Sequence, residues 1–169
     1  MASIVDDLKA QARIFHRLAT ARDPAALARL QAARVSEQPI QRRHCLTVLA
    51  RELGFGGWPH AVSVLGGEAV TDFGTLLYPP GSAAHWNIWS ASYEEARSIR
   101  LEHGGYLLAY KRQFLIVDVH FIETLGLDPH DPDWERIGRD WIQPADAGAR
   151  ARLYDKLVRA RRQTSRLSS

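Results

Sequence analysis

The stretch that decides the fold is 85-HWNIWSASYEEARSIRLEHGGYLLAYKRQFLIVDVHF-121, which predicts a strand, a capped helix and a hairpin of two apolar strands. Ser92 stands three residues before Glu95, the spacing at which a serine side chain caps a helix and the glutamate reaches back to its amide. Gly104 ends the predicted helix, because glycine readily adopts the left-handed conformation that closes many helices. The apolar runs Tyr106 to Tyr110 and Phe114 to Val117 follow, separated by a short polar segment that suits a hairpin turn. The stretch therefore predicts a small antiparallel sheet with a helix beside it.

The first 66 residues are predicted to be helical. Apolar residues recur at helical spacing from Val5 to Ala19, which predicts one amphipathic helix over residues 3–21. Asp23 followed by Pro24 starts a second helix that runs to about Val35, and a third helix ends at Gly54. A fourth, shorter helix opens at Trp58. Together these helices form a predicted N-terminal bundle.

Residues 67–84 form the predicted linker, since they are rich in glycine and proline. The apolar run from Phe73 to Tyr78 within them is compatible with an edge strand. Residues 85–169 form a lobe that ends in a basic amphipathic helix starting at Asp146. The predicted fold class is α+β, with the N-terminal helical bundle packed on a small antiparallel sheet that has flanking helices.

The composition indicates a cytoplasmic protein that folds without covalent crosslinks. The chain has 169 residues, of which 46% are hydrophobic, so it can bury a sizeable core. Its single cysteine, Cys45, excludes an internal disulfide, and no stretch has the apolar length of a membrane span. Asp6 and Asp7 argue against an N-terminal transit peptide. The oligomeric state stays open.

Charge is unevenly distributed along the chain. The formal net charge is +4 over residues 1–65, −6 over residues 66–145 and +5 over residues 146–169. Basic ends around an acidic middle indicate either self-complementary packing or a basic surface for an acidic partner. In the last helix, Arg152, Lys156 and Arg159 share a basic side that would contact nucleic acid in the second interpretation. In the first, the helix docks on the acidic middle of its own chain.

Two segments resemble known bacterial sequences. LARELGFGGWP, residues 49–59, resembles a helical hairpin found ahead of some ankyrin-repeat or glyoxalase-like domains and, more loosely, the second helix-turn-helix of AraC-type regulators. The regulator resemblance implies a helix that reads DNA, yet the helix after Phe55 offers only His60 and Ser63 for base contacts. The segment from Trp86 to Trp141, with HWNIW, HGGYLLAY and DPDWERIGRDW, resembles a family of small uncharacterised bacterial proteins. That resemblance implies a family without an assigned activity.

A metal site is the first chemistry to weigh. If residues 85–89 form a strand, His85, Asn87 and Trp89 share one face, and Asp118 and His120 share a face where the hairpin ends. His85, Asp118 and His120 would then be ligands suited to zinc or iron, with His103 as a fourth ligand or a base. The alternative is that Asp118 caps the following helix and the histidines are polar edges of a packed layer.

The sequence contains no motif for other kinds of catalysis. Cys45 lies in the apolar pattern of the third helix, where burial disfavours the thiolate, and no G-x-S-x-G elbow occurs. The glycine pairs lack the lysine and preceding strand of a phosphate loop, so they are predicted to end helices. No cofactor is predicted, and an enzymatic function is not the favoured prediction.

The remaining feature is a group of aromatic residues, whose members either fill the core or line a binding surface. The candidate binding residues are Trp86, Asn87, Trp89, Tyr106 and Tyr110. The predicted function is a non-catalytic binding or regulatory module that holds a protein or small molecule on this surface. The alternatives are a nucleic-acid-binding regulator that uses the basic helices and a small metal-dependent enzyme.

Overall fold

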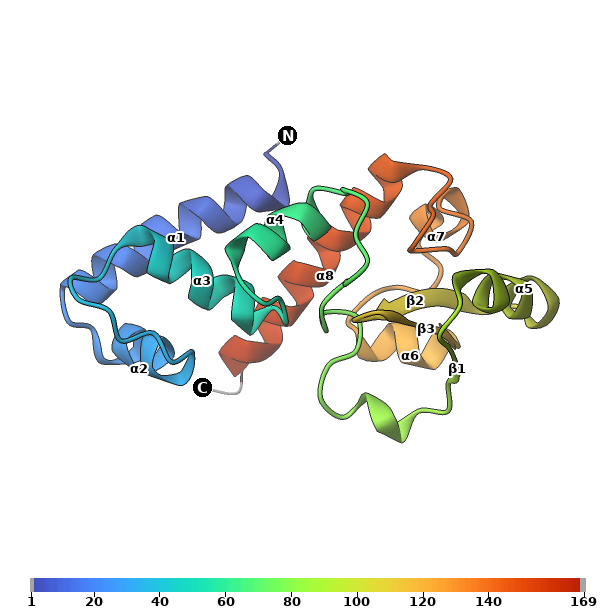
Figure 1. The fold of residues 1–169 in the computed structure, drawn as a ribbon, viewed down its shortest axis with the longest axis horizontal. Coiled ribbons are helices and arrows are strands. Elements are labelled where there is room, and N and C mark those ends of the chain that lie inside the picture. The colour runs from blue at the N-terminus through green and yellow to red at the C-terminus, as the bar shows by residue number, and fades with distance from the viewer. Residues whose placement is uncertain (1, 168–169) are drawn as a thin grey trace. The chain divides into compact units, whose positions relative to one another are not determined.

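The computed structural model describes residues 2–167 and divides the chain into two compact units. The first unit ends at Glu68 and the second begins at Ala69, so most of the predicted linker belongs to the second unit. The first unit is helical, and the second combines helices with a three-stranded antiparallel sheet (Figure 1). The α+β class predicted from the sequence is confirmed. None of the helices within residues 2–167 has the length and apolar character that a membrane crossing requires.

Unit 1 is built from four successive helices, α1 (Ile4–Thr20), α2 (Pro24–Ala32), α3 (Arg42–Glu52) and α4 (Trp58–Leu65). Ser3 caps α1 and Asp23 caps α2 through hydrogen bonds from backbone amides three residues on. The apolar stripe of α1 packs against α2 and α3, as the helical spacing predicted. One cluster of the core comprises Ala12, Phe15, Ala19, Ala26, Leu30, Cys45, Val48 and Leu49.

The second helix is shorter than the sequence predicted. It ends at Ala32, because Arg34 adopts a left-handed conformation with φ of 56° and the Val35 amide turns back to the Leu30 carbonyl. A left-handed residue just past the last turn terminates an α-helix. The segment from residue 33 to residue 41 therefore leaves the helix and runs to the start of α3.

Unit 2 carries the sheet and the remaining helices. Its elements are the 3₁₀ turn η1 (Ser82–Ala84), β1 (Ile88–Ser90), α5 (Tyr93–His103), β2 (Tyr106–Tyr110), β3 (Gln113–Val117), α6 (Val119–Thr124), α7 (Pro132–Arg136) and α8 (Ala147–Leu167). Ser92 caps α5, and Gly104 ends it with φ of 80°, as predicted. The predicted edge strand at Phe73 to Tyr78 is absent from this described segment. Instead, two backbone hydrogen bonds, from Phe73 to Lys111 and from Lys111 to Gly74, tie it to the hairpin tip.

The sheet has the order β1-β3-β2 and is antiparallel throughout. On one face, Leu107 and Ile116 pack with Ala96 of α5, so α5 covers that face. Because side chains alternate along a strand, Tyr106, Leu108 and Tyr110 point to the other face, together with Leu115. Trp89 of β1 pairs with Leu115 and joins them. This second face carries the aromatic residues that concern the candidate site.

A chain of aromatic contacts connects β2 to the last helix. Tyr106 meets Trp134 at 4.9 Å between ring centroids, Trp134 meets Trp141 at 5.4 Å, and Trp141 meets Tyr154 of α8 at 4.8 Å. All four residues are buried. Residues 139–141 also hydrogen-bond to Leu107, so they cover the free edge of β2. The centre of unit 2 is therefore an aromatic layer under the sheet.

Close packing of α8 on the end of α6 predicts that Gly126→Ala is more damaging than Gly138→Ala. Gly126 and Gly138 each follow a short helix with positive φ, 78° and 70°. A Cβ at Gly126 would lie 2.8 Å from the Ala160 Cβ, whereas one at Gly138 would meet nothing within 4 Å. Both variants bear a left-handed alanine, which costs about 1 kcal/mol, and Gly126→Ala adds an overpacking cost of about 1–2 kcal/mol. Urea denaturation should show this difference, and equal losses of stability would contradict the close approach.

Candidate functional site

Three aromatic rings from separate segments meet beside the sheet. Tyr78 contacts Trp89 of β1 and Tyr110 of β2, with 5.1 Å between ring centroids in each pair and an edge-to-face arrangement. Trp89 and Tyr110 also meet edge to face at 6.0 Å. Below them Phe121 of α6 is fully buried and stacks on Tyr78 at 6.0 Å. The cluster therefore has a buried base and a partly exposed top.

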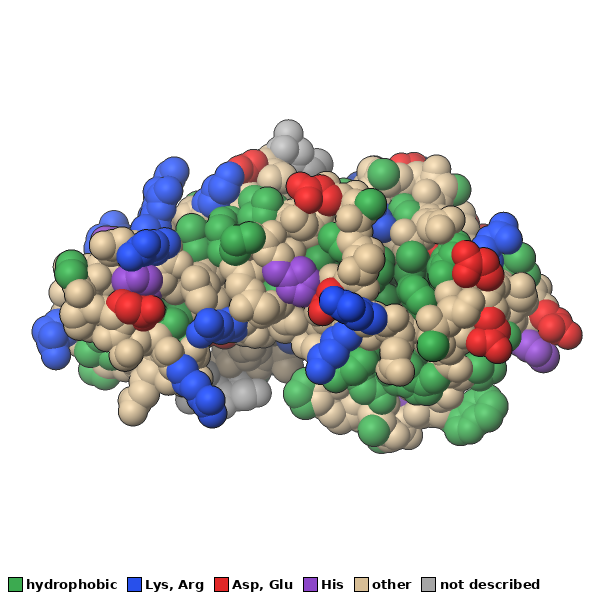
Figure 2. Space-filling model, viewed as in Figure 1, with side chains coloured by type: hydrophobic (Ala, Val, Ile, Leu, Met, Phe, Trp, Pro, Cys, Tyr) green, Lys and Arg blue, Asp and Glu red, His purple; other side chains and the backbone are tan. Residues whose placement is uncertain are grey.

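Trp89 of this cluster and the nearby Trp86 expose much of their surface. Trp89 is 41% exposed, and Trp86, three residues earlier in the same segment, is 86% exposed. We call Tyr78, Trp86, Trp89 and Tyr110 the aromatic surface. Figure 2 shows hydrophobic side chains gathered at the lower edge of unit 2, over the stretch that carries η1. A tryptophan this exposed stabilises the fold little, because it buries almost no apolar area.

Asn87 lies between the two tryptophans and is half-buried. Its side-chain oxygen Oδ1 is shielded from solvent and has no hydrogen-bond partner among the described residues. An unsatisfied buried acceptor costs about 1–3 kcal/mol. The unsatisfied Oδ1 of Asn87 is therefore a local energetic cost within the fold.

Tyr106 does not belong to the aromatic surface, although it shares a sheet face with Tyr110. The two residues are four positions apart on β2, about 13 Å along an extended strand. At its end of the strand Tyr106 is 2% exposed under Trp134, and its hydroxyl donates to the Pro129 carbonyl at 2.9 Å. Of the five predicted binding residues, Tyr106 is thus a core residue, and the prediction for it is wrong.

Lysine and arginine border the aromatic surface on one side. Lys111 and Arg112 form the exposed turn between β2 and β3, one residue shorter than predicted because Gln113 already pairs with Tyr110. The Lys111 Nζ lies 5.4 Å from the centroid of the Tyr110 ring. An ammonium group at this distance from a ring gains a cation–π attraction. The rim of the surface is therefore cationic.

The structure does not bring the predicted metal ligands together as a site, although Asp118 and His120 both belong to the start of α6. The predicted strand at 85–89 begins only at Ile88, so His85 follows η1 and its ring packs edge-on against Phe121 at 5.7 Å. Asp118 caps α6 by accepting from the Phe121 amide at 3.0 Å. His120 is exposed and faces Glu123, and His103 is exposed next to Glu102. Among the described residues, no group of three or more His, Cys, Asp or Glu side chains could hold a metal ion.

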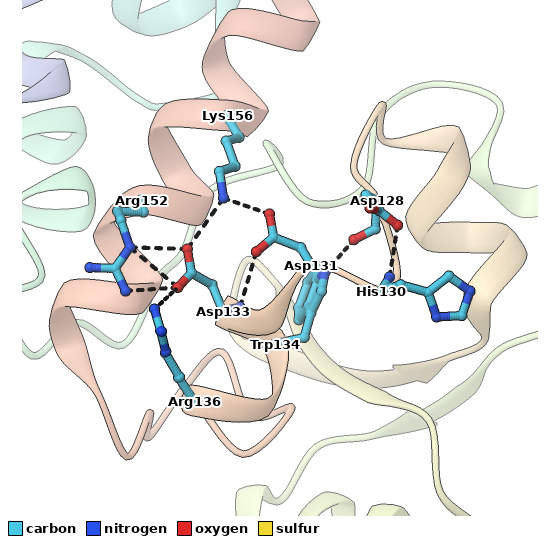
Figure 3. Close-up of polar contacts among 8 residues, drawn as sticks. All are labelled: Asp128, His130, Asp131, Asp133, Trp134, Arg136, Arg152 and Lys156. Carbon is cyan, nitrogen blue, oxygen red and sulfur yellow. Dashed lines mark hydrogen bonds and ion pairs between the residues drawn. The ribbon is translucent and has the colours of Figure 1, made fainter.

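The basic side of α8 is neutralised within unit 2. Arg152 forms two parallel hydrogen bonds to the Asp133 carboxylate, at 3.0 Å from Nε and 2.7 Å from Nη2. Lys156 Nζ lies 2.5 Å from Asp131 and 3.2 Å from Asp133 (Figure 3). Arg159 pairs with Asp155 of the same helix at 3.0 Å. All three predicted nucleic-acid contacts therefore already have carboxylate partners, and the helix docks on the acidic part of its own chain.

Asp133 is the centre of this network. Its carboxylate is 3% exposed and also accepts from Arg136 at 3.2 Å. The hydrogen bonds from Arg152 and then from Lys156 lower the pKa of Asp133 from 3.8 to about 2, against the opposing effect of burial. The carboxylate is charged at neutral pH and joins α7 to α8. This geometry indicates a structural network.

The helical hairpin at residues 49–59 is closed by its own contacts. Gly54 has φ of 89°, and the Phe55 amide donates back to the Ala50 carbonyl at 3.0 Å. Phe55 is buried, and its ring meets His60 edge-on at 5.4 Å. The His60 Nδ1 accepts from the Gly56 amide at 3.0 Å, so this nitrogen is already engaged. The packed hairpin is the interpretation that these contacts favour.

Cys45 is fully buried in the core of unit 1. Burial raises the pKa of its thiol above the ordinary value, with Arg29 opposing the shift. A thiol that resists ionisation is a poor nucleophile. Cys45 therefore acts as a small apolar core residue, as its place in the helical pattern predicted.

The sequence analysis did not identify Tyr78, which contacts Trp89 and Tyr110 of the aromatic surface. Tyr78 lies in the predicted linker, which is rich in glycine and proline. The apolar run that ends at Tyr78 was the one available signal that this segment packs.

A comparison of the chain with protein-family models, curated proteins and solved structures finds no match.

Proposed function

We propose that this protein is a non-catalytic binding module whose second unit holds a partner on the aromatic surface. The observation that carries the proposal is the 86% exposure of Trp86, three residues before Trp89 of the Tyr78, Trp89 and Tyr110 cluster. Tryptophan and tyrosine are enriched among residues that dominate binding energy, since they bury large areas at low entropic cost. The cationic turn at Lys111 adds a polar feature to an apolar centre.

These features also describe the partner. It brings an apolar or aromatic group to Trp86 and Trp89, and an acidic group toward Lys111 and Arg112. Apolar contact supplies affinity, and charge complementarity at the rim supplies orientation and a faster encounter. A short protein segment or an organic anion with a hydrophobic body meets these requirements.

Native mass spectrometry of the untagged protein purified from its source tests the proposal, since one spectrum reports subunit number and any retained molecule. The retained partner is then titrated against the wild type and against the Trp86→Ala, Trp89→Ala variant. We expect the double variant to weaken binding by at least about 30-fold, since truncating such residues costs about 2 kcal/mol or more.

The matched control is Leu101→Ala, which removes an apolar side chain that is 58% exposed on α5, on the opposite side of the sheet. It should leave the affinity within about twofold, as expected for a side chain outside the interface. Equal affinity of the wild type and the tryptophan double variant would refute the aromatic surface as the binding site.

A further inference from the structure

We propose that unit 1 carries a second, independent site, a pocket that binds a small amphiphilic anion. Its ligand is an organic molecule with an apolar body that ends in a carboxylate, sulfonate or phosphate. The site lies between α2 and the segment of residues 33–41, and it shares no residue with the aromatic surface. This site can therefore be tested independently of the proposed function.

The pocket is an open groove with the volume of a small-molecule site. Its volume is about 490 Å³, within the range of about 300–1,000 Å³ that ligand pockets occupy. Four apolar side chains form its walls, Leu27 and Leu30 from α2 and Val35 and Ile40 from the segment that follows. Apolar walls of this kind hold the body of a ligand by excluding water from it.

Hydrogen bonds to backbone carbonyls hold the wall of the pocket in place at three points. The Val35 amide donates to the Leu30 carbonyl at 2.9 Å, and Arg51 donates to the Ala33 carbonyl at 2.6 Å. At the far end, the His16 Nε2 lies 2.9 Å from the Ile40 carbonyl oxygen. Because both ends of the segment are tied to helices, the pocket does not need to be formed by its ligand. A preformed pocket loses less conformational entropy on binding.

Arg34 gives the pocket its charge. This exposed residue lines the pocket, and its guanidinium has no ion-pair partner among residues 2–167. The remaining polar lining is uncharged, Gln31, Ser36 and Gln38, and the nearest carboxylate along the wall segment, the exposed Glu37, is outside the lining. An arginine fork beside an apolar wall recognises a carboxylate, sulfonate or phosphate through charge-assisted hydrogen bonds.

The charge of the whole unit supports the same ligand. Residues 1–68 contain nine Lys and Arg against six Asp and Glu, while residues 69–169 contain thirteen of each. The excess positive charge of the protein therefore belongs to the unit that holds the pocket, and Figure 2 shows basic side chains spread over that unit. This field favours the approach of anions.

The test uses two fluorescent probes of similar apolar size, the anion 8-anilinonaphthalene-1-sulfonate and the neutral N-phenyl-1-naphthylamine. We expect the full-length protein to bind both probes. Arg34→Glu should lower the affinity for the anion by at least about tenfold and change the affinity for the neutral probe by less than about twofold, because only the charge-assisted bonds are lost. Gln31→Trp, at an exposed lining position, should weaken both probes by filling the pocket.

Arg22→Glu is the matched control. Arg22 is also an exposed arginine in a left-handed conformation two residues after a helix, with φ of 61° against 56° for Arg34, but it lies outside the pocket lining. It changes the net charge equally and should leave both affinities unchanged. Equal losses in Arg22→Glu and Arg34→Glu would overturn the site, since the effect would then be one of overall charge.

A further variant distinguishes probe binding at the pocket from probe binding at the aromatic surface. Probe binding that survives Trp86→Ala, Trp89→Ala and is reduced by Gln31→Trp supports the pocket. Probe binding that is lost in the tryptophan variant and retained in Gln31→Trp, or absent from the wild type, overturns it.

Discussion

Trp134→Ala is expected to lower the free energy of unfolding by about 4 kcal/mol, a value within the range measured for truncating a buried tryptophan. Trp134 is 1% exposed and lies between Tyr106 of β2 and Trp141, so it joins the sheet to the segment before α8. Its Nε1 also donates to the Asp128 carbonyl at 3.1 Å. The variant loses the apolar contacts and leaves a cavity between these elements. Urea denaturation followed by far-ultraviolet circular dichroism measures the loss.

Trp86→Ala is the control for this substitution, because it removes the same side chain from a position that is 86% exposed. We expect its effect to stay below about 0.5 kcal/mol, as for other surface substitutions. Trp134→Phe should fall between the two, since the ring contact with Tyr106 persists while the hydrogen bond to Asp128 is lost. A Trp134→Ala variant as stable as Trp86→Ala would show that the aromatic layer is not the core of unit 2.

Asp133→Asn is expected to destabilise the protein by about 2–3 kcal/mol at neutral pH, since hydrogen bonds to charged groups contribute about 1.5–3 kcal/mol. The carboxylate is 3% exposed and accepts from both Arg152 and Lys156. The two cations are 45% exposed, so water solvates them in the variant. Their exposure keeps the cost below that of stranding a fully buried charge, which is about 3–5 kcal/mol.

The same network predicts how stability depends on pH. The pKa of Asp133 is lowered from 3.8 to about 2 in the folded state. The folded state therefore favours the ionised carboxylate, and this contribution is present above about pH 4 and is lost as the pH falls from about 4 to about 2. The difference in stability between the wild type and Asp133→Asn should accordingly shrink over that interval. Urea titrations at pH 6, 4 and 2.5 measure it.

Glu135→Gln is the control on the same short helix. Glu135 pairs with Arg139 but is 71% exposed, and such surface pairs contribute about 0–1 kcal/mol. We expect a loss below about 0.5 kcal/mol for this variant, as for an exposed pair on a helix. If Asp133→Asn kept the stability of the wild type at pH 6, the network would contribute nothing to holding α7 on α8.

Local signals in the sequence determined most of the secondary structure. Ser92 and Asp23 cap the helices they were predicted to cap, and Gly104 ends α5, because a cap needs only a side chain within reach of the next few amides. The hairpin strands follow from two apolar runs and a polar turn. The docking of α8 on its own acidic segment also followed from the sequence, as one of two alternatives left open by the charge pattern.

The aromatic surface depends on contacts that local sequence signals do not predict. Tyr106 and Tyr110 look equivalent in sequence, being aromatic and on the same face of one strand. Which of them is buried depends on Trp134, which lies 28 residues after Tyr106 and covers only one end of β2. Tyr78 reaches Trp89 and Tyr110 because its segment hydrogen-bonds to the hairpin tip, a pairing between distant residues.

The sequence by itself thus determined the α+β class, the capped helices, the hairpin and the aromatic and basic residues among which function was sought. The tertiary structure alone decided that Arg152 and Lys156 are neutralised by Asp131 and Asp133, that the described His, Cys, Asp and Glu side chains form no metal-binding group of three, and that a pocket opens beside Arg34. The physical reason is range: caps and strand alternation act within a few residues, whereas burial and ion pairing depend on segments that are distant along the chain and adjacent only after folding.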